Sequence, residues 1–295
     1  MSDFMVQADN LVKIYKTKEI EVMALQGLDL TVPKGSLMAI IGSSGSGKST
    51  FLNMIGGLDK PSAGKLFVDG KNLFTMSEKE LVLYKRSTVG FVWQNNARNL
   101  LPYLTALENI MMPMHLNNTN LKKEKALELL DLIGLSSKKH HRLQQMSGGE
   151  QQRIAIAIAL SNDPKVLLAD EPTGSVDRKT SDHIFDIFKH LNEDKGQTII
   201  IVTHDVSMSK KVQRVAAIRD GKISSEKILK EHYSDRMRDS SLDWQNEETH
   251  EEYSIIDKKG CVQIPKEILD DINLTDNKLK VEYRNGQIVL EKPKS

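Results

Sequence analysis

A glycine-rich segment, residues 42–50, constrains this chain more than any other. It fits the pattern G-x-x-x-x-G-K-[ST] and reads Gly42, Ser43, Ser44, Gly45, Ser46, Gly47, Lys48, Ser49, Thr50. The apolar run Leu37–Ile41 precedes it, and the helix-like run Phe51–Ile55 follows it. This order predicts a strand, a tight loop and a helix, whose backbone N–H groups and helix N-terminus surround a phosphate.

The residues that close the pattern indicate the ligand. In loops of this kind Lys48 reaches the β- and γ-phosphates of a nucleoside triphosphate, and Ser49 supplies a hydroxyl to Mg²⁺. A flexible Gly/Ser turn is the competing interpretation, and the correctly placed Lys-Ser-Thr argues against it. We therefore expect the chain to bind ATP or another nucleoside triphosphate together with Mg²⁺.

Composition narrows the class of protein. The 295 residues suffice for one large domain and a smaller one. With 41 basic and 40 acidic residues, net +1, no global charge favours nucleic acid or an anionic membrane. The single cysteine, Cys261, excludes an internal disulfide framework. Because there is no apolar run of roughly 18 residues and no signal peptide, we expect a soluble cytoplasmic protein.

Four short apolar runs predict parallel strands buried on both faces, which indicates an α/β fold. They are Leu37–Ile41, Val89–Val92, Val166–Ala169 and Ile199–Val202. Polar residues follow them: the glycine-rich loop, Gln94, Asp170 with Glu171, and His204. Because ligands collect at the carboxyl ends of such strands, we expect these groups to meet at one site. Asp220-Gly221 predicts a hairpin turn near the end of this domain.

The pattern divides the chain into three parts. Residues 1–223 form the α/β domain, with a helical insertion at about 95–158 in which Lys122–Leu132 is the clearest helix. Residues 224–252 are acidic and predict a linker, with a short helix around Ile228–Met237. Residues 253–295 predict strands, a short helix after Pro265 and a hairpin at Asn285-Gly286. Such a short segment rarely buries a core alone, so we expect it to pair with a second copy or with the main domain.

A second motif, residues 146–153, reads Met-Ser-Gly-Gly-Glu-Gln-Gln-Arg. It resembles the L-S-G-G-Q signature of ATP-binding cassette (ABC) proteins. Ser147, Gly148, Gly149 and Glu150 open a helix, which is suited to binding an anion. An ordinary helix cap is the alternative. The resemblance implies that the signature covers the γ-phosphate held by a partner subunit, so that the protein acts as a homodimer.

Further motifs follow in the family's order, and the resemblance implies a role for each. Glu171 resembles the general base and His204 the switch residue that senses the γ-phosphate. Asp170 orients Mg²⁺, and Gln94 contacts Mg²⁺ and hinges the helical insertion. Asp177 lies in the loop that crosses the dimer interface, and Tyr15 stacks on adenine. The implied fold is the P-loop ABC nucleotide-binding domain, a mixed sheet with a helical insertion, and the implied activity is ATP hydrolysis.

The segment 170–177, Asp-Glu-Pro-Thr-Gly-Ser-Val-Asp, resembles the lipoprotein-releasing, macrolide-efflux and antimicrobial-peptide-resistance branch. This resemblance implies a separately encoded ABC permease with its own transmembrane subunit, and a role in export or resistance. The permease is expected to dock near Gln94 and Leu101–Glu108, which would hold the protein on the inner face of the cell membrane.

Residues 257–268 resemble the swapped-hairpin, AbrB-like pattern D-x-x-G-R-V-x-I-P-K-E-I. Cys261 stands where arginine is common, and residues 253–295 carry eight basic and seven acidic side chains, a balance that favours dimerisation over nucleic acid binding. An ATP-responsive DNA-binding regulator remains the main alternative. A non-transport ABC protein acting on DNA or ribosomes is less favoured, because neither a long coiled-coil insertion nor a second cassette is present.

Overall fold

The computed structural model describes residues 3–16, 20–94, 100–116, 122–230, 249–257, 260–264, 266–272 and 278–291. The chain divides into two compact units, Met1–Tyr253 and Ser254–Ser295. Among the described residues, no helix combines the length and the apolar character needed to cross a bilayer.

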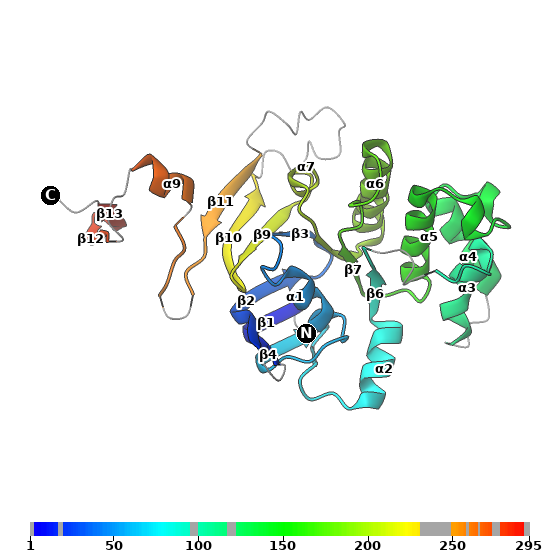
Figure 1. Ribbon diagram of the computed structural model, residues 1–295, viewed down its shortest axis with the longest axis horizontal. Helices are drawn as coiled ribbons and strands as arrows, with labels where there is room; N and C mark the ends of the chain where they lie inside the picture. The colour runs from blue at the N-terminus through cyan, green and yellow to red at the C-terminus, as the bar shows by residue number, and fades with distance from the viewer. Residues whose placement is uncertain are drawn as a thin grey trace. The chain divides into compact units, whose positions relative to one another are not determined.

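A seven-stranded sheet forms the centre of the first unit (Figure 1), and its strand order is β11-β10-β9-β3-β8-β7-β6. The strands are β3 (Leu37–Ile41), β6 (Val89–Val92), β7 (Val166–Asp170), β8 (Thr198–Val202), β9 (Arg214–Arg219), β10 (Lys222–Leu229) and β11 (His250–Ser254). The five strands from β9 to β6 are parallel, whereas β10 runs antiparallel to β9. All four predicted apolar runs are therefore confirmed as strands. The hairpin turn predicted at Asp220-Gly221 is also confirmed, because it joins β9 to β10.

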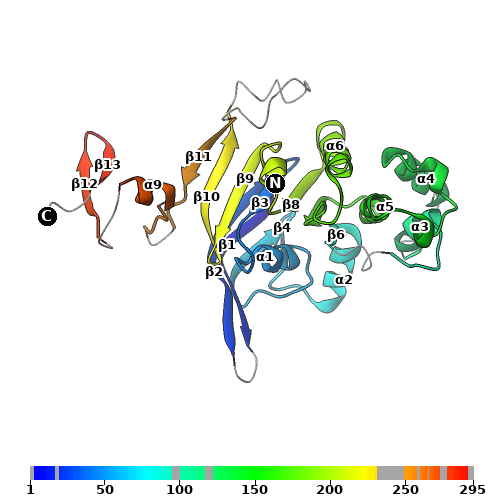
Figure 2. The same cartoon turned by 45° about the horizontal axis from the view of Figure 1, so that its top comes forward.

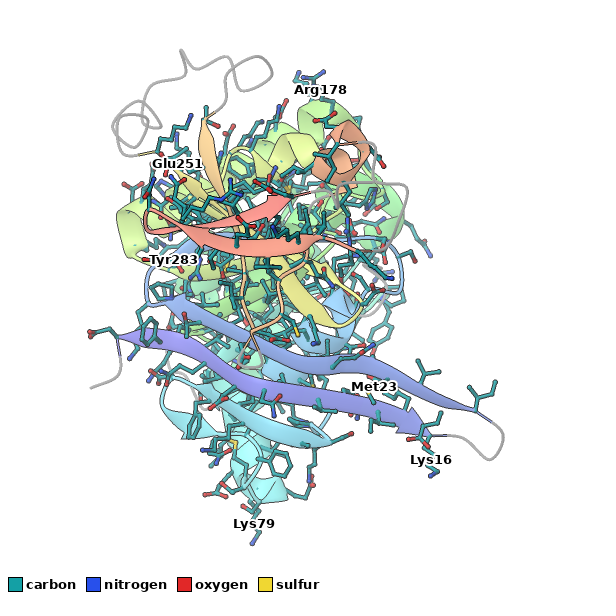
Figure 3. All side chains as sticks on the ribbon, turned by 90° about the vertical axis from the view of Figure 1, so that its left-hand side faces the viewer. Lys16, Met23, Lys79, Arg178, Glu251 and Tyr283 are labelled. Atoms are coloured by element: carbon teal, nitrogen blue, oxygen red, sulfur yellow. The ribbon has the colours of Figure 1, made fainter. Side chains whose placement is uncertain are left out.

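A second, antiparallel sheet, which the sequence analysis does not predict, has the order β2-β1-β4-β5. Its strands are β1 (Phe4–Lys16), β2 (Glu21–Pro33), β4 (Ala63–Val68) and β5 (Lys71–Asn72). The first two form a long ribbon that extends beyond the rest of the unit (Figure 2). Figure 3 shows these strands side by side, with Lys16 and Met23 toward the far end. Alternate residues of each strand are buried, so that one face of the ribbon is covered, but register shifts around Asn10 interrupt the alternation in β1.

Helices cover the central sheet and form a separate helical group. They are α1 (Lys48–Ile55), α2 (Glu78–Ser87), α3 (Ala106–His115), α4 (Lys122–Leu132), α5 (Gly148–Leu160), α6 (Arg178–Lys195) and α7 (Val206–Ser209), with 3-10 turns η2 (Ser136–Lys138) and η3 (Leu143–Gln145). In Figure 1, α3, α4 and α5 lie together on one side of the unit. They fall in the predicted insertion, although the last of them, α5, ends at Leu160, two residues past the end predicted for the insertion at about 158. Residues 95–99 and 117–121 of the insertion lie outside the described residues.

The predicted linker at residues 224–252 is wrong at both ends. Residues 224–229 continue β10, and residues 250–252 belong to β11. Glu252 accounts for this, because its carboxylate accepts a hydrogen bond from Ser225 (2.9 Å) and pairs with Lys227 (3.0 Å). Paired charges therefore stabilise a segment whose acidity indicated a linker. Ile228 lies in this strand and not in the predicted helix, and residues 231–248 lie outside the described residues.

The second unit contains a short helix, α9 (Lys266–Asp271), and a hairpin of β12 (Lys280–Arg284) and β13 (Gln287–Glu291). The predicted turn at Asn285-Gly286 is confirmed, since both residues have positive φ (50° and 84°) between paired strands. Of the strands predicted at residues 253–256 and 261–264, residues 253–254 belong to β11, and the remainder forms one bridge between Ile256 and Val262. Pro265 lies outside the described residues.

Candidate functional site

The glycine-rich loop packs tightly against the backbone of β2 and of β9. At Gly47, which precedes α1, φ is 107°, and a Cβ atom would lie 2.6 Å from the Ala24 carbonyl oxygen. At Gly42, a Cβ atom would lie 2.3 Å from the Ile218 carbonyl oxygen. Only glycine fits at these positions, because any side chain would collide with backbone. The loop is therefore held at the carboxyl end of β3, with its backbone turned toward the start of α1.

Lys48 lies across this loop. Its ammonium group donates to the carbonyl oxygens of Gly42 and Ser43, both at 2.8 Å, and only 9% of the residue is exposed. The next residue, Ser49, donates from its hydroxyl to Asp170 Oδ1 at 3.2 Å. A largely buried cation thus lies beside a hydroxyl and a carboxylate. This donor set suits phosphate oxygens and a hard, oxygen-binding divalent cation such as Mg²⁺.

A cavity of about 410 Å³ opens over the loop. It is lined by Val22, Met23, Ala24, Gly42, Ser44, Gly45, Gly47, Lys48, Ser49, Thr50, Gln94, Glu171 and His204. The polar members come from the segments that directly follow β3, β6, β7 and β8 in sequence. These four strands neighbour one another in the parallel part of the sheet. The structure thus brings together the groups that were expected to converge at one edge of the sheet.

Glu171 and His204 contact each other in this cavity. The Nδ1 atom of His204 lies 2.8 Å from Glu171 Oε2, and the His204 backbone N–H donates to the same oxygen at 3.3 Å. Glu171 has a φ of 48°, which is strained for a residue with a side chain. Its backbone N–H donates to the Val202 carbonyl at 2.8 Å. The neighbouring strand thus holds the Glu171 carboxylate at the cavity wall, where it can accept a proton from a bound water.

The signature residues do not line this cavity. Ser147 caps α5 through a reciprocal capping box: its hydroxyl accepts from Glu150 N (3.2 Å), and the Glu150 carboxylate accepts from Ser147 N (2.8 Å). This backbone hydrogen bond lowers the pKa of Glu150. A Cβ at Gly149 would lie 2.5 Å from Thr180 Cγ2, so this glycine allows α5 to approach the start of α6.

Asp177 also lies away from the cavity lining, at the N-terminus of α6. Its carboxylate accepts hydrogen bonds from the Thr180 hydroxyl (2.7 Å) and from Thr180 N (3.0 Å), and these bonds lower the pKa of Asp177. Of the predicted site residues, the structure therefore places Ser147–Glu150 and Asp177 at helix starts outside the cavity.

Tyr15 lies beside the cavity and does not line it. It pairs in register with Val22, a lining residue, so both side chains lie on the same face of the ribbon. Val22, Met23 and Ala24 of β2 also line the cavity, although no sequence motif predicted them. Their position follows from the pairing of β1 with β2, and the register shifts in that pair make the pairing hard to recognise in the sequence.

Residues 25–174 match the family model described as ABC transporter. The chain is 46% identical over 213 residues to an uncharacterized ABC transporter ATP-binding protein of Thermotoga maritima, covering 72% of this chain and 90% of that protein. It is 40% identical over 232 residues to the ABC transporter ATP-binding protein MJ0796 of Methanocaldococcus jannaschii, covering 77% of this chain and 98% of that protein.

Solved structures give the same result. A dimeric structure of MJ0796, described as a bacterial ABC transporter cassette, has a TM-score of 0.72 at 39% identity, covering 77% of this chain and 99% of that one. A dimeric post-hydrolysis state of the same cassette, bound to ADP and Pi, has a TM-score of 0.71 at 39% identity, with the same coverage.

Proposed function

This chain belongs to the ABC transporter family as an ATP-binding ATPase subunit, and on that premise we propose that it works as a homodimer enclosing ATP between two subunits. One observation carries the proposal. The cavity contains the phosphate-binding loop, Gln94, Glu171 and His204. The signature residues Ser147–Glu150 do not line it and form the capped N-terminus of α5. Each cavity then requires the signature of a second subunit to surround the γ-phosphate.

Within each site we assign the hydrolytic roles to the residues that line the cavity. Glu171 is the general base that accepts a proton from the attacking water, and His204 contacts the γ-phosphate. Lys48 exchanges its carbonyl partners for phosphate oxygens, where its positive charge stabilises the transition state. Gln94 hinges the helical group to the site.

We assign Mg²⁺ to Ser49, Asp170 and Gln94. When bound, this ion neutralises charge on the β- and γ-phosphates. The Ser49 hydroxyl and the Asp170 carboxylate, already 3.2 Å apart, would hold it. Gly42, Ser43, Ser44, Gly45, Ser46, Gly47 and Thr50 surround the phosphates, Tyr15 stacks on adenine, and Asp177 lies at the dimer interface.

The mechanical partner in this proposal is a separately encoded permease, which would hold the subunit at the inner face of the membrane for export or resistance. The segment after residue 99 supports this assignment. Asn109, which is 2% exposed, accepts a hydrogen bond from Leu101 N (2.8 Å) and donates to Leu101 O (3.1 Å) and Leu104 O (3.3 Å). These bonds fix a loop that presents Tyr103, 66% exposed, on the surface.

We assign dimerisation to the second unit, as an AbrB-like element. Its hairpin exposes Val281 (66%), Tyr283 (78%) and Ile288 (70%), an apolar set that a second copy would cover. An ATP-responsive regulator that binds DNA through this unit is the alternative function. The balanced charge of residues 253–295 favours dimerisation over DNA binding.

Mixing two inactive variants tests the shared site. Ser147→Arg blocks the signature and Lys48→Ala removes the phosphate counter-charge, so neither homodimer should hydrolyse ATP. A heterodimer of the two retains one site with an intact loop and an intact signature, and should recover activity. Folded variants that bind one another and yet recover no activity would contradict the homodimer proposal.

A further inference from the structure

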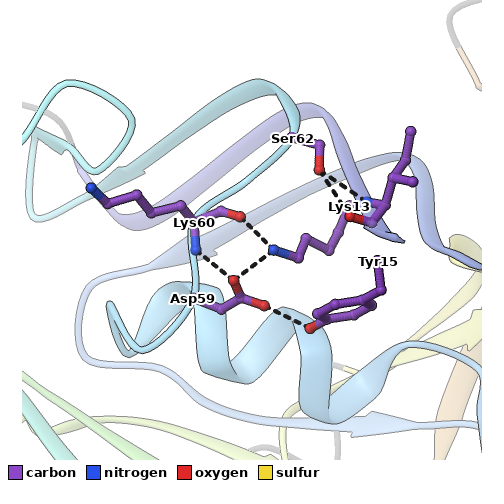
Figure 4. A network of polar contacts seen from close by, with 6 residues as sticks. Lys13, Tyr15, Asp59, Lys60 and Ser62 are labelled. Atoms are coloured by element: carbon purple, nitrogen blue, oxygen red, sulfur yellow. Dashed lines mark hydrogen bonds and ion pairs between the residues drawn. The ribbon is translucent and has the colours of Figure 1, made fainter. Parts of the chain in front are cut away.

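A compact polar network joins the β1–β2 ribbon to the turn after α1 (Figure 4). The Lys13 ammonium donates to Asp59 Oδ1 (2.6 Å) and to the Lys60 carbonyl oxygen (2.9 Å). The Tyr15 hydroxyl donates to the other carboxylate oxygen, Asp59 Oδ2, at 2.7 Å. Both oxygens of Asp59 are therefore engaged, one by a cation and one by the tyrosine.

The network is partly shielded from solvent. The Lys13 and Asp59 side chains are 11% and 27% exposed. Burial acts to raise the pKa of Asp59, but the hydrogen bonds from Lys13 and Tyr15 outweigh it and lower that pKa, so the carboxylate is ionised at neutral pH. The Lys13 ammonium also lies 4.7 Å from the centroid of the Tyr15 ring. One face of this ring is thus occupied by a cation, and its hydroxyl is fixed by an anion.

The same network reaches the nucleotide cavity. Tyr15 pairs with Val22, which lines the cavity, and its hydroxyl also interacts with the side chain of Thr50, another lining residue. Without these partners a tyrosine that is 40% exposed would sample several rotamers. Ordering such a side chain during binding costs free energy, whereas a ring that is already held does not incur that cost.

We propose that Asp59 is a positioning residue for the nucleotide base, which holds the Tyr15 ring at the cavity with Lys13 as its charge partner. This inference rests on the proposed stacking of Tyr15 on the base. It assigns a role to the Gly-Leu-Asp turn after α1, because the turn carries the carboxylate to the ribbon.

Titration calorimetry with ATP and with tripolyphosphate, which has no base, tests the proposal in the full-length protein. Asp59→Ala and Tyr15→Phe should each weaken ATP binding about fivefold. The double variant should be no weaker than either single variant, because both changes break the same contact. Tripolyphosphate binding should not change. Asp59→Asn, which keeps the shape of the side chain, is the second variant if Asp59→Ala does not fold.

The Lys211–Asp182 ion pair (2.7 Å) supplies the control, since neither residue lines the cavity. Asp182→Ala should leave ATP affinity unchanged. The positioning role of Asp59 alone would be overturned by either of two results. One is a double variant whose loss of ATP affinity is the product of the two single losses, and the other is an equal loss of affinity for ATP and for tripolyphosphate. If Tyr15→Ala leaves ATP affinity unchanged, the stacking role of Tyr15 fails, and the role of Asp59 fails with it.

Discussion

Replacing Asn109 with alanine should destabilise the protein through the loop that precedes α3. The Thr105 carbonyl would retain the Asn109 backbone N–H (2.9 Å), and the Leu101 carbonyl would retain the Leu104 N–H (3.1 Å). The Leu101 N–H and the Leu104 carbonyl would each lose the side-chain amide. At about 1–1.5 kcal/mol for each lost bond, less about 0.6 kcal/mol for the better helix propensity of alanine, the net loss is about 2 kcal/mol.

Urea denaturation would measure this loss, and amide hydrogen exchange would locate it. Exchange at Leu101 should accelerate more than exchange in the central sheet. Asn192→Ala is the matched control, since Asn192 is 7% exposed and its amide donates to Gly35 O (2.8 Å) and Gln197 O (2.9 Å). That variant should lose similar stability without faster exchange at Leu101. A loss below about 0.5 kcal/mol, or unchanged exchange at Leu101, would refute the reasoning.

Two further predictions follow from the proposed function. Glu171→Gln should reduce ATP turnover at least about a hundredfold while preserving ATP binding, because the base is removed and the phosphate loop is intact; gel filtration should show an ATP-dependent dimer, and near-normal turnover would reject Glu171 as the base. Deleting residues 255–295, which spares all of β11, should make the nucleotide-free protein monomeric and its ATPase activity concentration-dependent. Sedimentation without ATP decides this, and equally stable dimers before and after deletion would remove the second unit from the dimer contact.

The strands of the parallel core were predictable because their apolar residues are consecutive in the sequence. Leu167, Leu168 and Ala169 are all fully buried, so a run without polar residues indicated a strand with two covered faces. The hairpins at Asp220-Gly221 and Asn285-Gly286 were predictable for a similar reason, since the residues that permit positive φ are adjacent.

The antiparallel ribbon and its network were not predictable from local pattern. In β1 the alternation is interrupted where Asn10 takes a φ of 48° and the register shifts. Lys13 and Asp59 are 46 residues apart, and no spacing rule joins them. The linker that was wrongly predicted to begin at residue 224 has a different cause. Composition alone does not show that Lys227 and Glu252 neutralise each other across two strands.

Two helix starts in this chain differ in a way that supports the shared-site proposal. The start of α1 has glycine at its N-cap, which provides no side-chain hydrogen bond, so its backbone donors suit a phosphate within the same subunit. The start of α5 is capped by Ser147 and Glu150. In that cap the Ser147 hydroxyl accepts from Glu150 N, which leaves its proton available for donation to a phosphate oxygen. A helix cap and a phosphate contact are therefore compatible at Ser147, since the first uses an oxygen lone pair and the second uses the hydroxyl hydrogen.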